Sequence, residues 1–412
     1  MIHPKMRHIY VGVDIHKATH TAVIIDCFGE KLGEITFNNK PSEYEGFLKE
    51  VKRHTSKGIT PLFGLEDVHS LGRALTVFLL SKKLVVKYVC SSLTYSERKN
   101  QSILHKTDSH DALCVARVLL NRFNELQDAN PQDNYWILDQ LVGRRRSIVK
   151  SSVAIKKHLH TYIMHHYPSC KQFFREFDRQ TAIEFWEKYP SPSKLKGVGV
   201  EELGAFLKIH SHNFYGLKKA EEILRLVAID GDTSNEFQET RDFIVTSSIK
   251  LLKSNNKEVS EIEERIRSIL PGFGYKLESM KGIETITAAE LITEIKDINR
   301  FATPDKLAKY SGVSPVTYSS GKMDKQFANR NGDRHLHSIF FSLAVTIIGN
   351  AGGNKKPINE VFHNYYKKKL SEGKTKKQAL KCVMRRLVNI IWGMMKNKTE
   401  YVNPVIVNPE NE

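Results

Sequence analysis

Cysteine and long hydrophobic runs are both scarce in this sequence. Its 412 residues include five cysteines, and no two of them form a Cys-x-x-Cys pair. An odd number of widely spaced cysteines argues against a disulfide framework and against a zinc site, so we expect a reducing cytoplasm. The longest apolar run, residues 339–348, is too short to span a bilayer. Residues 1–10 lack the apolar core of a signal peptide, and we expect no membrane partner.

Acidic residues are also in deficit. Asp and Glu number 46 against 63 Lys and Arg, which gives a net charge of +17. The basic residues are spread along the whole chain, which favours a long nucleic acid over a small acidic substrate. Hydrophobic residues make up 40% of the chain, which is well above the range of disordered proteins. The length is sufficient for two or three domains.

The first third of the chain predicts an α/β domain. Residues 8–15, 21–26 and 34–37 alternate as short strands joined by tight turns, a pattern typical of an antiparallel meander. Further elements are expected as strands at 60–65 and 85–89 and as helices at 44–54, 72–81 and 108–123. Three strands, helix, strand, helix, strand, helix is the element order of a ribonuclease H-like domain.

The rest of the sequence favours helices. Helical periodicity extends from 132 to 167 and from 236 to 270, and a heptad pattern in the second stretch predicts helix pairing around a small helical insert. A helix–hairpin–helix turn at 281–289 precedes helices expected at 303–310, 333–349, 359–372 and 375–397. The predicted organisation is therefore an α/β domain at 1–130, a coiled-coil and helical linker at 131–275, a mostly α-helical domain at 276–402 and a disordered tail at 403–412.

Four acidic residues stand where these elements begin or end. Asp14 is near the end of the first strand, Glu66 follows the 60–65 strand, and Asp108 and Asp111 share one face at a helix start. Taken singly, Glu66 suits a solvated strand end, Asp108 a helix cap and Asp111 an acid near a helix N-terminus. An acid on an apolar strand such as Asp14 is costly to bury unpaired. Together the four predict a carboxylate site for magnesium (Mg2+), which serves phosphodiester chemistry.

A serine-rich segment, residues 310–322, is the second candidate site. Ser320 precedes a glycine in a basic loop, where it suits either a nucleophile or an ordinary polar turn. Residues 330–334 suit either phosphate binding or a loop and helix cap. Basic side chains that are candidates for nucleic-acid contact are Lys106, Arg144, Arg145, Arg146, Lys322, Arg330 and Arg334. Residues 367–386 add a basic helix pair, which is either a solvated face or a backbone-binding surface.

These motifs resemble those of the DEDD-type transposases of one large insertion-sequence family, described as bridge-RNA-guided serine recombinases. The matching segments are residues 12–17 (Gly-Val-Asp-Ile-His-Lys), 64–66, 106–112, 282–283, 288–289, 310–312, 320–321 and 330–336. The similarity covers nearly the whole chain in the same order. Two segments depart from it. Asp-Val-His-Ser follows Glu66 where the family has a small residue and then Thr-Gly, and Arg-Asn-Gly-Asp-Arg at 330–334 replaces Arg-Gly-Asn-Arg.

The resemblance implies a RuvC-like N-terminal domain, a coiled-coil linker for assembly and a C-terminal transposase domain. It implies that the four acids bind Mg2+ and that Ser320 attacks a DNA phosphate, with Ser319 as the alternative one residue away. The implied partners are donor and target double-stranded DNA, a non-coding guide RNA and further copies of the chain. A dimer or tetramer would share a composite active site, at the nucleoid of a bacterial or archaeal cytoplasm.

The expected function is therefore a DNA transposase or recombinase of an insertion sequence that acts through a phosphoserine intermediate. Two other functions fit the residues. A metal-dependent nuclease of the Holliday-junction type would use the acids and water without a covalent intermediate. A catalytically silent nucleic-acid-binding protein would need neither the acids nor the serine.

Overall fold

The chain divides into two compact units. The computed structural model describes residues 3–68, 70–100, 107–131, 133–233, 236–320, 323–327, 329, 332–351 and 356–403. The first unit is formed by Met1–Ile137 and Lys296–Ala302, and the second by Leu138–Ile295 and Thr303–Glu412. Within the described ranges, no helix has the length and apolar character needed to cross a membrane.

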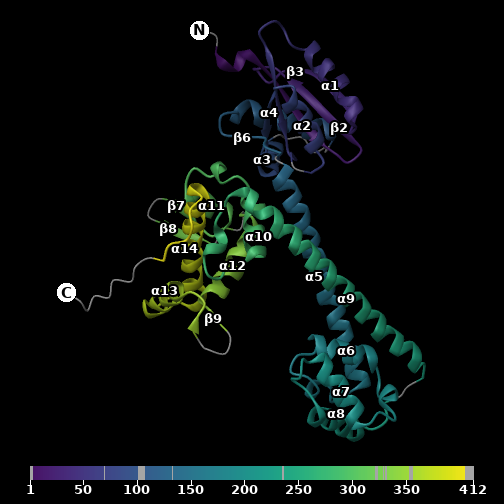
Figure 1. Ribbon diagram of the computed structural model, residues 1–412. Coiled ribbons are helices and arrows are strands. Elements are labelled where there is room, and N and C mark those ends of the chain that lie inside the picture. Colours follow the sequence, from purple (N-terminus) through teal and green to yellow (C-terminus); the bar gives the residue numbers. More distant parts are fainter. Residues whose placement is uncertain are drawn as a thin grey trace, which may run out of the picture. The chain divides into compact units, whose positions relative to one another are not determined.

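The first unit is a mixed α/β domain (Figure 1). Its elements are η1 (Pro4–Arg7), β1 (His8–Ile15), β2 (Thr19–Ile25), β3 (Lys31–Asn38), α1 (Pro41–Arg53), β4 (Thr60–Leu65), α2 (Arg73–Ser81), β5 (Val85–Tyr88), α3 (Ser91–Lys99), α4 (Asp108–Arg122), β6 (Gln127–Asp128) and η6 (Ile298–Arg300). The predicted strands at 8–15 and 60–65 have the predicted bounds. Helix α3 and strand β6 were not predicted, since α3 buries only Thr94 and so has no apolar stripe.

The six strands form one sheet in the order β3-β2-β1-β4-β5-β6. Strand β4 runs parallel to β1 and β5, and the remaining neighbours are antiparallel. Because successive strand residues point to opposite faces, β1 serves two cores. Ile9, Val11 and Val13 pack with α1 and α2 on one face, and Tyr10 packs with α4 on the other. The central strands are consequently buried on both sides.

The second unit is mostly helical. It contains the greater part of α5 (Asp133–His166), then η2 (Cys170–Gln172), α6 (Gln180–Lys188), η3 (Pro192–Leu195), α7 (Val200–His210), α8 (Leu217–Asp230), α9 (Gln238–Ile269), η4 (Leu270–Phe273), η5 (Leu277–Ser279), α10 (Thr285–Ile295), α11 (Pro304–Tyr310), β7 (Val316–Ser320), β8 (Met323–Phe327), α12 (Arg334–Ile348), β9 (Asn350–Ala351), β10 (Lys356–Pro357), α13 (Glu360–Ser371) and α14 (Lys376–Asn397).

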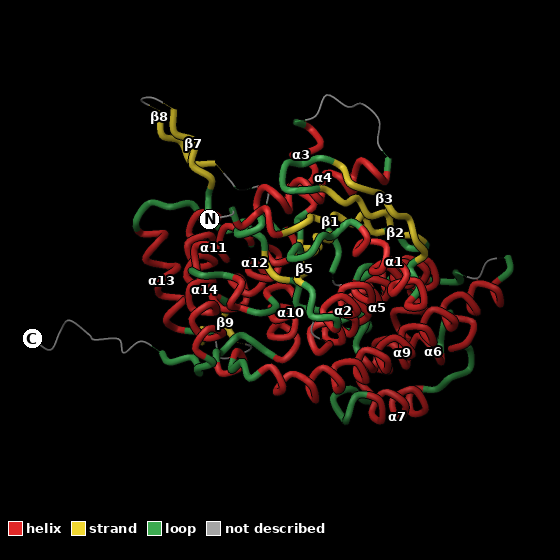
Figure 2. The backbone as a smooth tube through the Cα atoms, turned by 90° about the horizontal axis from the view of Figure 1, so that it is seen from above, coloured by secondary structure: helices red, strands yellow, loops and turns green. Residues whose placement is uncertain are grey.

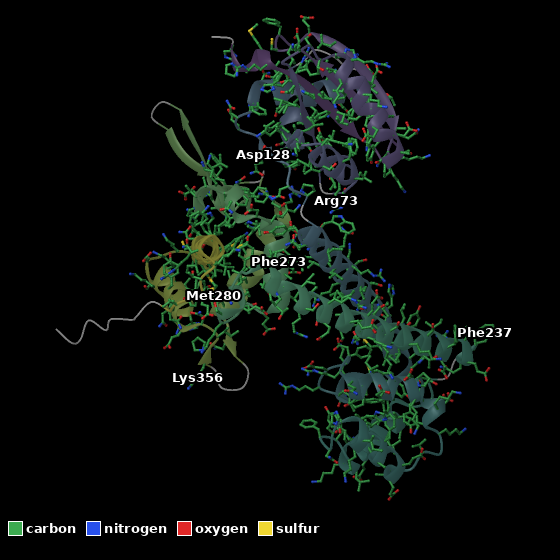
Figure 3. All side chains as sticks on the ribbon, turned by 45° about the horizontal axis from the view of Figure 1, so that its top comes forward. Arg73, Asp128, Phe237, Phe273, Met280 and Lys356 are labelled. Carbon is green, nitrogen blue, oxygen red and sulfur yellow. The ribbon has the colours of Figure 1, made fainter. Side chains whose placement is uncertain are left out.

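Helices α5 and α9 run side by side in opposite directions (Figure 1). Figure 3 labels Phe237 and Phe273, which bracket α9. Val245 and Ile249, at heptad positions of α9, are buried in a core that also contains Leu159 and Ile163 of α5. Helices α6 to α8, the predicted insert, pack on the pair around an aromatic core centred on Trp186.

The C-terminal helices surround α14, which contacts α11, α12 and α13. Its start is a capping box in which Thr375 and Gln378 exchange hydrogen bonds between side chain and backbone. Figure 2 shows β7 and β8 as a hairpin that projects from the helices near α11. The predicted basic loop around Ser320 is therefore wrong in part, because the segment contains two paired strands.

Candidate metal centre and serine hairpin

The sheet places Asp14 beside Glu66. In the parallel pair β1–β4, Val13 is the register partner of Leu65. The residue after each of these two is an acid. Asp14 and Glu66 therefore lie next to each other at the carboxyl ends of β1 and β4. Side chains alternate along a strand, so Asp14 projects to the same face as Tyr10, which is the face covered by α4.

Helix α4 approaches that face closely because β1 has a glycine there. A Cβ atom on Gly12 would lie 2.2 Å from the backbone nitrogen of Ala116 and 2.3 Å from the carbonyl oxygen of Ala112. Only glycine permits this approach. The Thr107 hydroxyl caps α4 by accepting a hydrogen bond from the His110 backbone nitrogen. The first turn of α4, with Asp108 and Asp111, is therefore held near the end of β1.

The four predicted acids come together at this edge of the sheet. Burial raises the pKa of Asp14 above its usual value of 3.8, and the negative charges of Asp111, Asp108 and Glu66 raise it further. The neighbouring His16 acts in the opposite sense, because its positive charge lowers the Asp14 pKa. A carboxyl group whose charge is disfavoured by burial and by three neighbouring acids favours the binding of a cation.

Three residues that were not predicted as site residues contact these acids. The Nε2 atom of His16 lies 3.0 Å from Asp14 Oδ2 and 3.3 Å from Asp108 Oδ1. The Thr94 hydroxyl donates a hydrogen bond to Glu66 Oε1. The Arg98 Nε atom lies 3.2 Å from Asp111 Oδ1. Both Thr94 and Arg98 belong to α3, whose sequence gives no helical signal, whereas the i, i+2 spacing from Asp14 could have indicated His16.

These residues fit a divalent metal ion. One ligand atom from each of Asp14, His16 and Asp108 lies within 4.8 Å of the others. The Asp14 Oδ2 atom is buried, and no hydrogen-bond donor of the described residues pairs with it. Carboxylate oxygens are the ligands that Mg2+ prefers, and a buried anionic oxygen without a donor needs a cation for its stabilisation.

The loop after Glu66 departs from the family pattern and has a structural role here. The Asp67 carboxylate accepts hydrogen bonds at 2.8 Å from the backbone nitrogens of Ser70 and Leu71. A Cβ atom on Gly72 would lie 1.9 Å from the Asp67 carbonyl oxygen, so the chain folds back tightly before α2. This loop therefore fixes the backbone immediately after Glu66. His69 lies outside the described residues.

Ser320 is the last residue of β7 and pairs with Met323 of β8. The adjacent Ser319 pairs with Asp324. Lys322, the basic candidate residue of this segment, lies outside the described residues.

The motifs at residues 310–312 and 330–334 contact each other at the base of this hairpin. The Asp333 backbone nitrogen donates a 2.6 Å hydrogen bond to the Tyr310 carbonyl oxygen. A Cβ atom on Gly332 would lie 2.3 Å from the Gly312 Cα atom, so the two turns are in direct backbone contact. The Asp333 side chain caps α12 by accepting from the Leu336 nitrogen at 2.7 Å. This contact fixes both ends of the segment that contains the serines.

The candidate nucleic-acid residues occupy different environments. The arginines of α5 have acidic neighbours: Arg144 pairs with Glu258 at 2.8 Å, Arg145 with Glu263 at 2.7 Å and Arg146 with Glu294 at 3.8 Å. Arg334 is exposed in the first turn of α12. Lys106 and Arg330 lie outside the described residues. The three α5 arginines therefore contribute to helix packing as well as to surface charge.

Two family models match the chain. A model of DEDD transposases of the IS110 type, described as "Transposase", matches residues 11–168. A second, described as "Transposase IS116/IS110/IS902 family", matches residues 274–367. The first match contains all four acids, and the second contains the hairpin with Ser320. The two matches together span more than half of the chain.

The chain is similar to proteins named for insertion elements and to a protein named for gene inversion. The "Insertion element IS116 uncharacterized 44.8 kDa protein" of Streptomyces clavuligerus is 23% identical over 95% of each chain. The "Insertion element IS110 uncharacterized 43.6 kDa protein" of Streptomyces coelicolor is 25% identical over 72% of each chain. A "Pilin gene-inverting protein" of Moraxella lacunata is 26% identical over 35% of this chain and 45% of its own.

Proposed function

The chain belongs to the IS110/IS116/IS902 family of transposases, and we propose that it cuts and rejoins DNA through a phosphoserine intermediate under the guidance of an RNA. The observation that carries the proposal is the convergence of Asp14, Glu66, Asp108 and Asp111 at one edge of the sheet. The first unit is then a RuvC-like nuclease domain, in agreement with its strand order and its buried acid.

Asp14, Glu66, Asp108 and Asp111 are the residues that would hold Mg2+. When bound, divalent ions polarise a phosphate and stabilise charge on the attacking and leaving oxygens. The protein contributes the orientation of the acids. Thr94 and Arg98 hold Glu66 and Asp111 from α3, which leaves Asp14 and Asp108 beside His16.

Ser320 is the proposed nucleophile. Its Oγ atom forms a bond to the phosphorus while one bond between phosphorus and a DNA oxygen breaks, and the departing oxygen takes a proton. The serine hydroxyl gives up its own proton in the same step. Because one phosphate ester replaces another, the bond energy is conserved, and attack by a second DNA end reverses the step to join strands.

The same proposal assigns roles to the rest of the chain. The α5–α9 pair and its helical insert, between the division points at 130 and 275, serve the assembly of a dimer or tetramer. In that assembly the acids of one subunit and the serine of another would form a composite site. The +17 charge suits donor and target DNA together with a guide RNA. Relatives named for inverting a pilin gene support rearrangement of DNA segments.

The test compares Ser320→Ala with Ser319→Ala in the full-length protein. We expect Ser320→Ala to abolish strand exchange and leave DNA binding intact, and Ser319→Ala to retain exchange. The wild type should yield a protein–DNA adduct that survives denaturation and yields phosphoserine on digestion. Undiminished exchange by Ser320→Ala would overturn the serine assignment.

The adduct also separates the proposal from its alternatives. A junction-type nuclease would release hydrolysed ends with no adduct, and both serine variants would cut normally. A catalytically silent binding protein would leave DNA uncut, and Asp14→Asn would change no cellular phenotype. The adduct in the wild type and its absence in Ser320→Ala are the results that support the serine route.

A further inference from the structure

We propose that His16 is a direct metal ligand, so that the centre is a mixed oxygen and nitrogen site rather than a set of carboxylates alone. The inference rests on the proposed function, because it assumes that the acids bind a divalent ion. It goes further by naming a residue outside the four acids and a preference among metals. The ion would be held by Asp14, His16 and Asp108.

The distances suit ligands of one ion. The His16 Nε2 atom is 3.0 Å from Asp14 Oδ2 and 3.3 Å from Asp108 Oδ1. Adjacent ligands of an octahedral ion with bonds of about 2.1 Å are separated by about 3.0 Å. The observed separations therefore match neighbouring positions around a small divalent cation.

Hydrogen bonding explains the arrangement less well. An imidazole Nε2 atom carries at most one N–H, which cannot point at two carboxylates at once. The Asp14 Oδ2 atom is buried and accepts no hydrogen bond from the described residues, although His16 is so near. A cation between the three atoms would satisfy the nitrogen and both oxygens together.

The backbone presents His16 to this position. His16 directly follows β1, two residues beyond Asp14, and a strand spacing of two places both side chains on one face. Its backbone nitrogen donates to the Thr19 carbonyl oxygen at 3.2 Å, which closes the turn into β2. The His16 side chain is 48% exposed, so the site is open to an ion and to a phosphate from solvent.

A nitrogen ligand changes which metals bind best. Oxygen ligands alone suit Mg2+ and Mn2+, whereas an imidazole favours later transition ions such as Co2+. The preference for Co2+ over Mg2+, measured as the ratio of the two affinities, should therefore be larger in the wild type than in a variant without the imidazole. We expect His16→Gln to reduce the ratio of Co2+ affinity to Mg2+ affinity by about tenfold or more. Loss of a residue that only contacts a metal ligand already lowers metal affinity by about 10-fold to 100-fold.

The decisive experiment is pulsed electron paramagnetic resonance of the full-length protein with substoichiometric Mn2+ and no DNA. We expect modulation from a directly bound imidazole nitrogen, which changes to the 15N pattern when the protein is produced with 15N-histidine. The signal should vanish in His16→Gln. It should persist in His8→Gln, a matched control at the opposite end of β1. Isotope labelling leaves the fold unchanged, so the result does not depend on how well a variant folds.

The outcomes separate this inference from the proposed function. Bound Mn2+ without nitrogen modulation would overturn the His16 assignment and leave the carboxylate centre standing. Nitrogen modulation that persists in His16→Gln would also overturn it. Failure of Mn2+ to bind at all, with Asp14→Asn indistinguishable from the wild type, would overturn the proposed metal centre itself.

Discussion

At the scale of single residues, Asp14 shows how binding and stability oppose each other. Burial and three neighbouring acids raise its pKa in the folded state above the ordinary 3.8. Its contribution to stability is therefore fully present below pH 3.8 and is lost as the pH rises through the raised folded pKa. Above that pH the ionised carboxylate favours unfolding, unless a cation neutralises it.

We expect Asp14→Asn to raise or maintain the melting temperature at pH 7 in the presence of a chelator. The amide cannot ionise, so the variant avoids the cost of the buried charge. The difference from the wild type should narrow as the pH falls towards 3.8. Thermal unfolding over this pH range measures the effect.

Added Mg2+ should make the wild type more stable than Asp14→Asn. Mg2+ at about 100 times its dissociation constant stabilises a binding protein by about 2.7 kcal/mol, and the variant should gain little of this. Strand cleavage should fall roughly 100-fold or more, as after the loss of other charge-stabilising groups. Equal stabilisation of both proteins by Mg2+ would argue against Asp14 as a ligand.

At the scale of elements, the packing of α4 on β1 decides whether the acids meet. The contact depends on Gly12, where a Cβ atom would fall 2.2 Å from backbone that cannot move independently of the helix. Helix α4 contains two of the four acids, so a shift of the helix changes the site as well as the core.

Gly12→Ala is expected to lower the free energy of unfolding by about 1–3 kcal/mol, the usual cost of overpacking, and to weaken Mn2+ binding. Gly46→Ala in α1 is the matched control, since nothing lies within 4 Å of its Cβ position. The control should be neutral or more stable by up to about 1 kcal/mol. Urea denaturation with a Mn2+ titration tests both. A Gly12→Ala protein that binds Mn2+ normally would show that α4 tolerates displacement.

Elements with a strong hydrophobic period could be predicted from the sequence, and others could not. Strands β1 and β4 have the expected bounds because their apolar runs are buried on both faces. Helix α3 buries a single residue, and the β7–β8 hairpin has too short an apolar pattern to be recognised. Asp14 and Glu66 could be predicted because one lies near the end of β1 and the other directly follows β4. Thr94 and Arg98 could not, because their place depends on the unrecognised helix α3.

At the scale of the whole molecule, the excess of positive charge sets how the protein meets nucleic acid. The net charge of +17 predicts binding driven by the release of counterions. Affinity for a duplex of arbitrary sequence should fall roughly 10³-fold or more between 50 and 200 mM salt, as for proteins with six or more phosphate contacts. Fluorescence anisotropy over a salt series measures the slope.

Two arginines test which charges contribute to that slope. Arg334→Ala, at an exposed position, should reduce the slope by about 1. Arg145→Ala should leave the slope unchanged and cost up to about 1 kcal/mol of stability, because Glu263 already pairs with this guanidinium. The opposite result would assign Arg145 to the nucleic-acid surface.

The short segment Lys296–Ala302 has a consequence for synthesis of the chain. It belongs to the first unit, where the Arg300 carbonyl oxygen accepts a hydrogen bond from Gln127, although residues 138–295 separate it from the rest of that unit. At the usual 5–20 residues per second, a ribosome needs roughly 8–30 s to reach it after residue 137. During that interval the first unit lacks its last segment, so a transcript truncated before residue 296 yields a first unit that is never completed.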